Sequence, residues 1–221
     1  MAHHPLQTKP EDLPRVLGVF PLNGVVLMPA GRLPLNVFEP RYLALVLDSL
    51  KDKRLIGMIQ PREPEKALTN PSLYSVGTVG RISAFSESED GRMMISLTGV
   101  CRFRLGEEQA PLHGYRRCAV DCAPFLPDFD IAQHSDLDRD HLMKVLNAYV
   151  RKEEVDLNID LLAGFSDPAL VAALAMILPF APREKQALLE AFTVAERGGM
   201  LTALMEMDNI SHGGVGSPGC Q

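Results

Sequence analysis

Apolar and polar residues alternate along the first half of the chain, and this period of two predicts strands. The clearest run lies between Met93 and Leu105, where most odd-numbered residues are apolar and the even-numbered ones include serine, threonine and arginine. A partner strand is expected over residues 75–86, because Asp90-Gly91 between the two runs suits a tight hairpin turn. Together with one helix, the strands favour a small closed or nearly closed sheet. Further strands are expected over residues 15–20, 24–27, 54–60 and 115–123.

Prolines recur at short intervals between residues 20 and 42. Because proline has no N–H and a fixed φ, Pro21, Pro29 and Pro34 are expected at strand ends or on edge strands. Pro40, by contrast, suits the first turn of a helix. After residue 42 leucine and valine recur at spacings of three and four, which predicts a helix of roughly three turns.

The second half changes to the helical period, with apolar residues three and four positions apart. Thr193 and Glu196 form a capping box at the start of the last helix, in which each side chain satisfies a free backbone N–H of the other residue. Gly198-Gly199 lies inside the same helix, and each glycine costs on the order of 1 kcal/mol there. The sequence therefore leaves open whether the helix continues through them or has a kink or a short break. Helices are expected over residues 137–154, 168–178, 183–192 and 194–207.

These patterns divide the chain into four parts. Residues 1–12 are polar and are expected to be a flexible N-terminus, and the glycine, serine and proline of residues 211–221 predict a disordered tail. Between them we expect a β-barrel-like subdomain over residues 13–126 and a helical subdomain over residues 127–210. The longest apolar run, residues 169–178, is about half of what a bilayer-spanning helix needs, and the N-terminus shows no export signal. A cytoplasmic protein without membrane contact is therefore expected.

Several short sequence words occur in a fixed order over residues 16–105. They are a Phe20-Pro21-Leu22 strand, a Leu33-Pro34-Leu35 turn, a Phe38-Glu39-Pro40-Arg41-Tyr42 helix start, and later Gly77-Thr78, Asp90-Gly91 and Arg102-Phe103. This order resembles the amino-terminal, substrate-binding domain of Lon proteases. The resemblance implies an α+β fold, with an N-terminal PUA-like β pseudobarrel that carries one helix and a C-terminal helical subdomain. Its structural signature consists of Phe20, Pro21, Leu22, Phe38, Glu39, Pro40, Arg41, Tyr42 and Arg102.

The resemblance also implies a function. In Lon proteases this domain helps to recognise unfolded or degron-bearing polypeptides and supports oligomer assembly, whereas ATPase and Ser-Lys peptidase modules carry out hydrolysis. Neither the ATP-binding loop G-x-x-x-x-G-K-[ST] nor the nucleophile motif G-x-S-x-G occurs in this chain. We therefore expect a stand-alone binding module that is not an enzyme. Such a module could serve a protease in trans and form a weak homo-oligomer.

Residues suited to catalysis or metal binding are scattered. Cys118 and Cys122 would lie about 13 Å apart on one strand, and neither C-x-x-C nor H-E-x-x-H occurs. Residues 214–219 match G-x-G-x-x-G, but no strand precedes them and no helix can follow. We therefore expect no catalytic residues, no metal and no other cofactor, and an unrecognised hydrolase is the least favoured alternative. The other candidate ligands, which share no spacing, are His113, His134, His141 and Cys220.

Charge gives little support to nucleic-acid binding. The formal charge is -6 and the pI about 5.5, so no global field concentrates the chain on RNA. The implied barrel resembles PUA-type barrels that bind RNA, so an RNA-binding module is the alternative function. However, the basic residues have no aromatic side chains between them on which RNA bases could stack. Glu39, next to a helix start, is expected to have a structural role with Arg41 or Arg102 as its cation. The basic residues of the strand-rich half, of which the first two share a face, are Arg102, Arg104, Arg116 and Arg117.

Polypeptide binding needs an apolar groove or an exposed strand edge, where backbone hydrogen bonds give affinity and side-chain pockets give selectivity. We expect it along the proline-rich residues 21–40 and at the junction between the subdomains, because pockets form between subdomains. The partners implied are unfolded or degron-bearing polypeptides. Apolar contact residues expected to be exposed are Val25, Leu27, Met28, Leu33 and Phe38.

Overall fold

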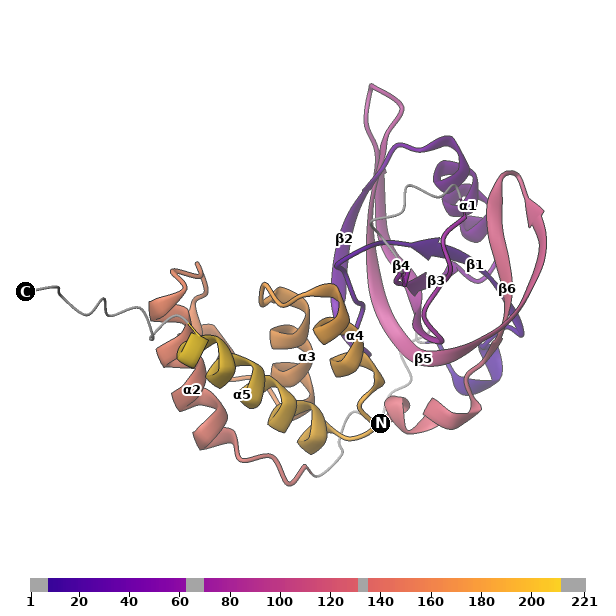
Figure 1. The fold of residues 1–221 in the computed structure, drawn as a ribbon. Coiled ribbons are helices and arrows are strands. Elements are labelled where there is room, and N and C mark those ends of the chain that lie inside the picture. Colours follow the sequence, from indigo (N-terminus) through magenta and orange to yellow (C-terminus); the bar gives the residue numbers. More distant parts are fainter. Residues whose placement is uncertain (1–7, 63–69, 131–134, 212–221) are drawn as a thin grey trace, which may run out of the picture.

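The computed structural model describes residues 8–62, 70–130 and 135–211, which form a barrel lobe and a helical lobe (Figure 1). A 3-10 helix, η2 (Ala123–Phe129), leads from the first lobe to the second. The barrel lobe contains η1 (Pro10–Asp12), β1 (Val16–Pro21), β2 (Arg32–Val37), α1 (Pro40–Leu50), β3 (Leu55–Ile59), β4 (Val76–Glu87), β5 (Met93–Leu112) and β6 (Tyr115–Asp121). The helical lobe contains α2 (Arg139–Lys152), the 3-10 helix η3 (Ile159–Leu162), α3 (Asp167–Ile177), α4 (Pro182–Glu190) and α5 (Val194–Ser211).

The strands form one mixed sheet in the order β2-β5-β4-β3-β1-β6, and β5 also pairs with β6. This second pairing closes the sheet into a pseudobarrel, which confirms the expected α+β fold with one helix in the barrel lobe. β1 and β3 run parallel, and the other pairs are antiparallel. β5 has 20 residues and bends at a bulge, because Gly80 pairs with Gly99 whereas Val79 pairs with Cys101. The expected hairpin turn at Asp90-Gly91 joins β4 to β5, and Gly91 has a φ of 76°.

The strand expected over residues 24–27 is absent, and this prediction was wrong. Gly24 makes a turn with a φ of 72°, and residues 25–28 form no regular element. They cross between two cores instead, with Leu27 in one core and Val26 and Met28 in the other. The strand lies further along, as β2, so the expected turn at residues 33–35 was also wrong. β2 ends the sheet order, which is where a strand tolerates a residue without an N–H such as Pro34.

The four long helices lie where the helical period predicts them. Thr193 and Glu196 form the expected capping box, in which Thr193 Oγ1 accepts from Glu196 N–H and Glu196 Oε2 accepts from Thr193 N–H, both at 3.1 Å. The sequence left open whether Gly198-Gly199 breaks the last helix, and α5 runs through both residues without interruption. Gly198 is buried where a Cβ atom would collide with the Leu137 side chain. The glycine therefore permits close packing in the helical lobe and does not interrupt the helix.

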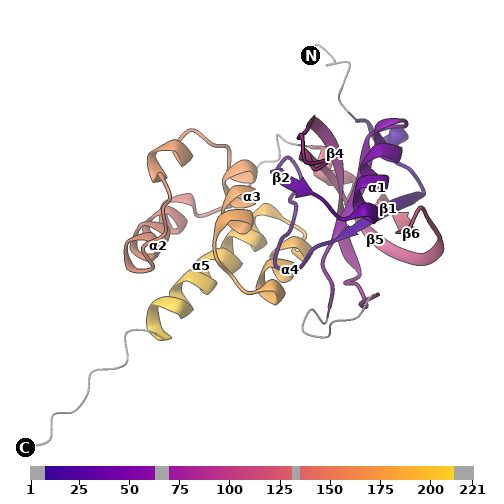
Figure 2. The same cartoon turned by 90° about the horizontal axis from the view of Figure 1, so that it is seen from above.

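Two hydrophobic cores hold the molecule together. One lies inside the barrel under α1, and the other extends from the barrel through η2 into the helical lobe. Met176 of α3 packs against both cores. Seen from above, α3 and α4 lie next to the barrel, and α2 lies on the far side of the helical lobe (Figure 2). The lobes are therefore joined through shared core and not only through the connecting chain.

The signature residues fix the start of α1. Pro40 is its first residue, and Tyr42 stacks on Phe20 of β1 with 4.1 Å between ring centroids. Arg41 lies over the Tyr42 ring at 4.6 Å and forms the ion pair with Glu39, 2.9 Å between Nη2 and Oε2. Glu39 therefore pairs with Arg41 and not with Arg102, the other cation expected for it.

Both chain ends are only partly described. Residues 1–7 and 212–221 lie outside the described residues, together with most of the two expected flexible segments, the G-x-G-x-x-G match and Cys220. Within the expected flexible N-terminus, Pro10–Asp12 form the 3-10 helix η1, and α5 reaches Ser211. Among the described residues no helix has the length and hydropathy to cross a membrane.

Candidate functional site

A cleft of about 60 Å³ lies where the two lobes meet. Its walls come from the loop before β2, from η2, from the first turns of α3 and from the turn between α4 and α5. Most of these side chains are apolar, and the charged groups are few and close together, which is the usual composition of a binding site. The lining residues are Pro29, Ala30, Arg102, Pro127, Asp128, Asp130, Pro168, Ala172, Phe192, Val194 and Arg197.

Arg102 of β5 is the central link at this junction. It is 3% exposed, and its Nε and Nη2 donate to the Asp128 carboxylate of η2 at 2.9 and 2.8 Å. Its remaining N–H groups donate to carbonyl oxygens at the end of α4 and in the α4–α5 turn, at 3.0 Å to Leu189, 2.6 Å to Ala191 and 3.3 Å to Phe192. All five guanidinium N–H groups thus have acceptors, as a buried cation requires.

A second guanidinium, that of Arg197 on α5, lines the same cleft and is 6% exposed. Its Nε donates to the Leu188 carbonyl at 2.8 Å, and its Nη2 donates to the Ala191 carbonyl at 2.9 Å. Burial, followed by the nearby charge of Arg102, lowers the pKa of Arg197 to about 10. The charges of Asp128 and Glu196 act in the opposite direction but do not outweigh these effects.

Phe192 gives the cleft an exposed aromatic rim. It lies in the α4–α5 turn, is 60% exposed, and stacks on the buried Phe125 of η2 with 6.0 Å between ring centroids. Leu126, next in the chain to Phe125, is also largely exposed. An exposed phenylalanine beside an apolar cleft with a polar floor is a typical contact site for another polypeptide.

Two buried glutamines form another polar link between the lobes. Gln60, just after β3, donates from Nε2 to the Pro182 carbonyl at 3.0 Å and to Gln186 Oε1 at 3.2 Å. Gln186 of α4 in turn donates to the Val76 carbonyl at the start of β4 at 3.0 Å. The cleft is thus bounded by lobes that are fixed to each other at two separate places.

Residues 16–207 match the family described as the ATP-dependent protease La (LON) substrate-binding domain. The chain belongs to this family. The match spans both lobes, so the cleft lies entirely within the family's domain. It also confirms the family that the sequence words over residues 16–105 resemble.

Relatives and solved structures agree with this assignment. Lon protease 2 of Sorangium cellulosum is 31% identical over 203 residues, and Lon protease 2 of Myxococcus xanthus is 34% identical over 114 residues. These matches cover 85% and 50% of this chain but only 24% and 13% of the two relatives, so this Lon-type chain spans a quarter or less of their length.

Two solved structures have the same fold. The crystal structure of a Lon N-terminal domain protein from Xanthomonas campestris is similar with a TM-score of 0.61 and 26% identity, covering 85% of this chain and 97% of that one. The N-terminal domain of a Mycobacterium avium complex Lon protease has a TM-score of 0.64 and 15% identity, covering 86% of this chain and 98% of that one.

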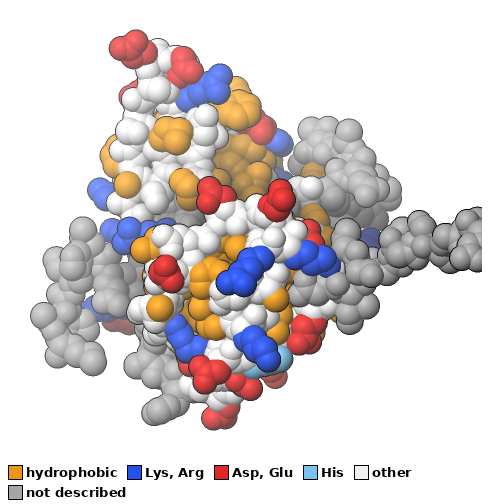
Figure 3. All heavy atoms as spheres, turned by 90° about the vertical axis from the view of Figure 1, so that its left-hand side faces the viewer, with side chains coloured by type: hydrophobic (Ala, Val, Ile, Leu, Met, Phe, Trp, Pro, Cys, Tyr) orange, Lys and Arg blue, Asp and Glu red, His pale blue; other side chains and the backbone are white. Residues whose placement is uncertain are grey.

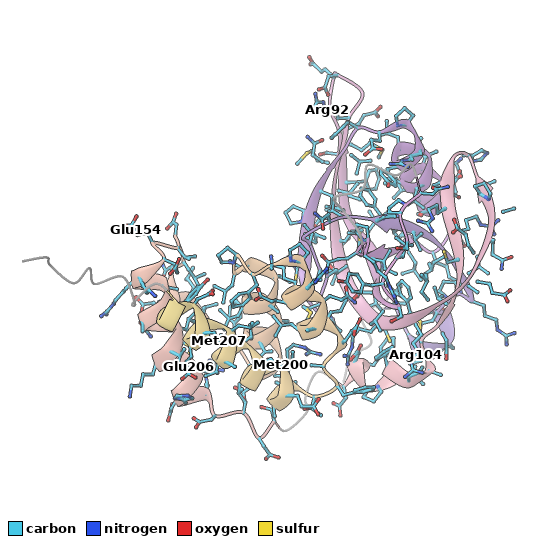
Figure 4. The ribbon with its side chains drawn as sticks, in the orientation of Figure 1. Arg92, Arg104, Glu154, Met200, Glu206 and Met207 are labelled. Atoms are coloured by element: carbon cyan, nitrogen blue, oxygen red, sulfur yellow. The ribbon has the colours of Figure 1, made fainter. Side chains whose placement is uncertain are left out.

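The five predicted contact residues do not form one surface of this Lon-type domain. Leu27 and Met28 are 1% and 0% exposed, so the expectation that they are exposed was wrong. Val25 and Leu33 are half-buried, and Leu33 packs against the barrel core. Phe38 is 60% exposed but lies beside Arg92, 5.6 Å from its ring, near the tip of the β4–β5 hairpin. Figure 4 shows Arg92 at this tip, well away from the helical lobe.

Arg102 and Arg104, which alternation places on one face of β5, do not form a common exposed basic surface, because Arg102 is 3% exposed and Arg104 is exposed. Arg102 points into the lobe junction, and Arg116 forms a two-pronged ion pair with Glu108 at 2.8 and 2.7 Å. Arg104 is exposed at the end of the barrel away from the β4–β5 hairpin tip, where Figure 4 labels Arg92. On the face seen from the helical lobe, hydrophobic side chains are exposed on both lobes, and cationic and anionic side chains are interspersed (Figure 3). Arg102 and Arg116 thus have partners within the protein, and these two residues give the RNA alternative no direct support.

Groups with possible chemistry lie apart from the cleft. Among the described residues no three His, Cys, Asp or Glu side chains gather as a metal site would require, and His134 and Cys220 lie outside that part of the chain. Cys101, Cys118 and Cys122 are buried thiols. His113 Nδ1 lies 2.6 Å from Asp48 Oδ2 at the β5–β6 turn, and the hydrogen bond from His113 is the main reason why the pKa of Asp48 is lowered.

The sequence predicted binding at the junction and along residues 21–40, which include the lining residues Pro29 and Ala30, but it did not point to Phe192, Asp128 or Arg197. Phe192 was assigned to the end of a helix, although the capping box at Thr193 places it in the turn. Asp128 falls at the start of the expected helical subdomain, and the sequence assigned it no role. Arg197 carries no signal in the sequence, because a buried and an exposed arginine on a helix look alike.

Proposed function

We propose that this Lon-type domain is a non-catalytic polypeptide-binding module whose contact surface is the cleft between the lobes. The observation that carries the proposal is the exposed ring of Phe192 at the rim of an apolar cleft with a polar floor. Folded proteins seldom offer a free apolar side chain in a flexible segment, whereas unfolded ones offer many. Contact with Phe192 therefore favours unfolded polypeptides.

The size of the cleft sets the size of what it binds. A cleft of about 60 Å³ is small, so we expect it to take a single side chain of the bound polypeptide at a time. Burial of apolar surface contributes roughly 25 cal/mol per Å², so a single buried side chain gives weak binding. A long unfolded chain presents several such side chains, and their rebinding raises the overall affinity.

The family description and the names of the relatives indicate what the bound chain is for. The family is described as substrate-binding, and the relatives are Lon proteases. We propose that the bound polypeptide is held for a protease module, in the same chain or in trans, and that the domain itself cleaves no peptide bond.

Two phenylalanines of equal exposure allow a controlled test. Phe192 lines the cleft, and Phe38 lies near the hairpin tip, and both are 60% exposed. Binding of labelled, reduced and carboxamidomethylated α-lactalbumin is measured by fluorescence anisotropy. We expect Phe192→Ala to weaken it about tenfold or more, as for a central contact residue, and Phe38→Ala to change it less than about twofold.

The reverse order of effects would move the contact surface to the hairpin tip and contradict the proposed site. The same protein samples, incubated with casein with and without ATP and examined by gel electrophoresis, test the enzyme alternative. Cleavage that a single substitution abolishes would refute a non-catalytic function.

A further inference from the structure

The guanidinium of Arg197 has more hydrogen-bond donors than acceptors. An arginine has five N–H groups in a planar fork. In Arg197 the side edge, formed by Nε and Nη2, donates to the carbonyls of Leu188 and Ala191. The end edge, formed by Nη1 and the second N–H of Nη2, has no acceptor among the described residues. Arg102, by contrast, uses all five donors.

The carboxylates near Arg197 are bound elsewhere. Asp128 accepts from Arg102, and Glu196 Oε2 accepts from the backbone N–H groups of Phe192 and Thr193 at 3.0 and 3.1 Å. No ion pair within 4.0 Å joins Arg197 to a carboxylate in the described part of the chain. The lowered pKa of Arg197 fits a buried cation without a counterion of its own.

The unused N–H groups of Arg197 are not sealed off, because Thr78 Oγ1 is the one fully buried side-chain N or O atom without a hydrogen-bond partner in the described part of the chain. An acceptor that reaches them gains a charge-assisted hydrogen bond. Arg197 is 94% buried, with 6% of its surface exposed, yet it lines the cleft, so an acceptor can reach it from there. The free end edge presents two parallel N–H groups, an arrangement that matches the two oxygens of a carboxylate. Asp130, at the exposed rim, opposes anions in general, and salt screens that effect.

We propose that Arg197 is the docking point for a carboxylate of the bound polypeptide, so that the cleft recognises an apolar side chain with an acidic group next to it. The inference rests on the proposed function, because the same cleft binds the apolar side chain. The carboxylate has two sources in a polypeptide, a free C-terminus or an aspartate or glutamate side chain. Either carboxylate accepts hydrogen bonds from the unused N–H groups at the end edge of the Arg197 guanidinium.

The test varies the ligand and leaves the protein intact. Four rhodamine-labelled peptides are compared by anisotropy: Gly-Ser-Gly-Ser-Leu-Phe with a free C-terminus or an amide, and Gly-Ser-Leu-Phe-Glu-Ser-amide or its Gln counterpart. We expect at least one acidic peptide to bind about tenfold more tightly than its neutral counterpart, as a charge-assisted bidentate hydrogen bond gives. The pair that shows the difference identifies the source of the carboxylate.

Arg197→Gln then tests the assignment to this residue. The variant keeps two donors for the carbonyls of Leu188 and Ala191, and its folding is checked by its thermal unfolding and by its affinity for the neutral peptides. We expect the acidic and neutral peptides to bind it within about twofold of each other. A tenfold preference that persists in Arg197→Gln overturns the proposal.

The outcomes separate this inference from the proposed function. In one outcome the neutral peptides bind the unaltered protein, Phe192→Ala weakens their binding, and the acidic peptides bind no more tightly than the neutral ones. The carboxylate proposal then fails, and the polypeptide-binding proposal stands. If none of the four peptides binds, and unfolded α-lactalbumin does not bind either, both proposals fail.

Discussion

The start of α1 and the junction between the lobes each contain an arginine–carboxylate pair, and the two pairs differ in almost every other respect. Arg41 and Glu39 lie on the surface, with side chains 38% and 45% exposed. Arg102 and Asp128 are buried, and Arg102 adds three carbonyl acceptors from the helical lobe. The start of α1 is the easier region to recognise in the sequence, yet the junction joins the lobes and forms the cleft. Recognisable sequence words thus report local backbone geometry more than the site.

Replacing the arginine of each pair by methionine gives the largest expected difference in the free energy of unfolding. Arg102→Met removes the cation that pairs with the buried Asp128 carboxylate and takes one donor from each of the carbonyls of Leu189, Ala191 and Phe192. We therefore expect a loss of about 3–5 kcal/mol in the free energy of unfolding. Arg41→Met removes an exposed pair and a cation–π contact and should cost about 1 kcal/mol or less. Urea unfolding followed by circular dichroism measures both. Equal losses would show that burial does not distinguish the two pairs.

Two adjacent glycines of α5 provide the next test, on the helical side of the junction. A Cβ atom at Gly198 collides with Leu137, so we expect Gly198→Ala to lower the free energy of unfolding by about 1–3 kcal/mol. Gly199 has no atom within 4 Å of such a Cβ, so Gly199→Ala should stabilise the protein by up to about 1 kcal/mol through helix propensity. Thermal unfolding of the two variants compares them directly, and a stabilising Gly198→Ala would contradict the packing that explains this residue.

A half-exposed pair provides an intermediate case with a pH dependence. Asp167 accepts from Ser135 at 2.6 Å and from Arg139 at 2.8 Å, and these hydrogen bonds lower the pKa of Asp167. Because the pKa of Asp167 is lower in the folded state than in the unfolded chain, this carboxyl group stabilises the folded state at pH values above about 4, the ordinary pKa of an aspartate. The stabilisation is lost as the pH falls through the lowered pKa of the folded state.

We therefore expect Asp167→Asn to reduce the free energy of unfolding by up to about 1 kcal/mol at pH 7, with a smaller difference in acid. Urea unfolding of both proteins from pH 7 down to pH 3 measures this change. A difference that grows as the pH falls would contradict the sign. A loss as large as that of Arg102→Met would remove the distinction between exposed and buried pairs.

Local patterns predicted most of the fold. The alternation along residues 93–105, the turn at Asp90-Gly91 and the capping box at Thr193 all depend on near neighbours in the chain, and the structure confirms them. The error at residues 24–27 and the open question at Gly198 have a different cause. Leu27 and Met28 enter two different cores, and Gly198 fits against Leu137, so in both places distant parts of the chain decide the conformation.

The candidate site depends even more strongly on contacts between residues that lie far apart in the sequence. Arg102 donates to carbonyls 87 to 90 residues away in the sequence, and no periodicity specifies that pairing. Alternation placed Arg102 on the polar face of β5, and the helical lobe covers that face at this position. The sequence therefore indicated the junction in general terms, whereas Phe192, Asp128 and Arg197 required the structure.

The long-range bonds of Arg102 also bear on how the protein is made. The ribosome synthesises β5 and Asp128 well before residues 189–192, which supply the carbonyl acceptors of Arg102. Until these residues leave the ribosome, part of the core that extends from the barrel into the helical lobe lies open to water. We therefore expect the barrel lobe to complete its folding only when the last helices arrive, with the two lobes maturing as one cooperative unit.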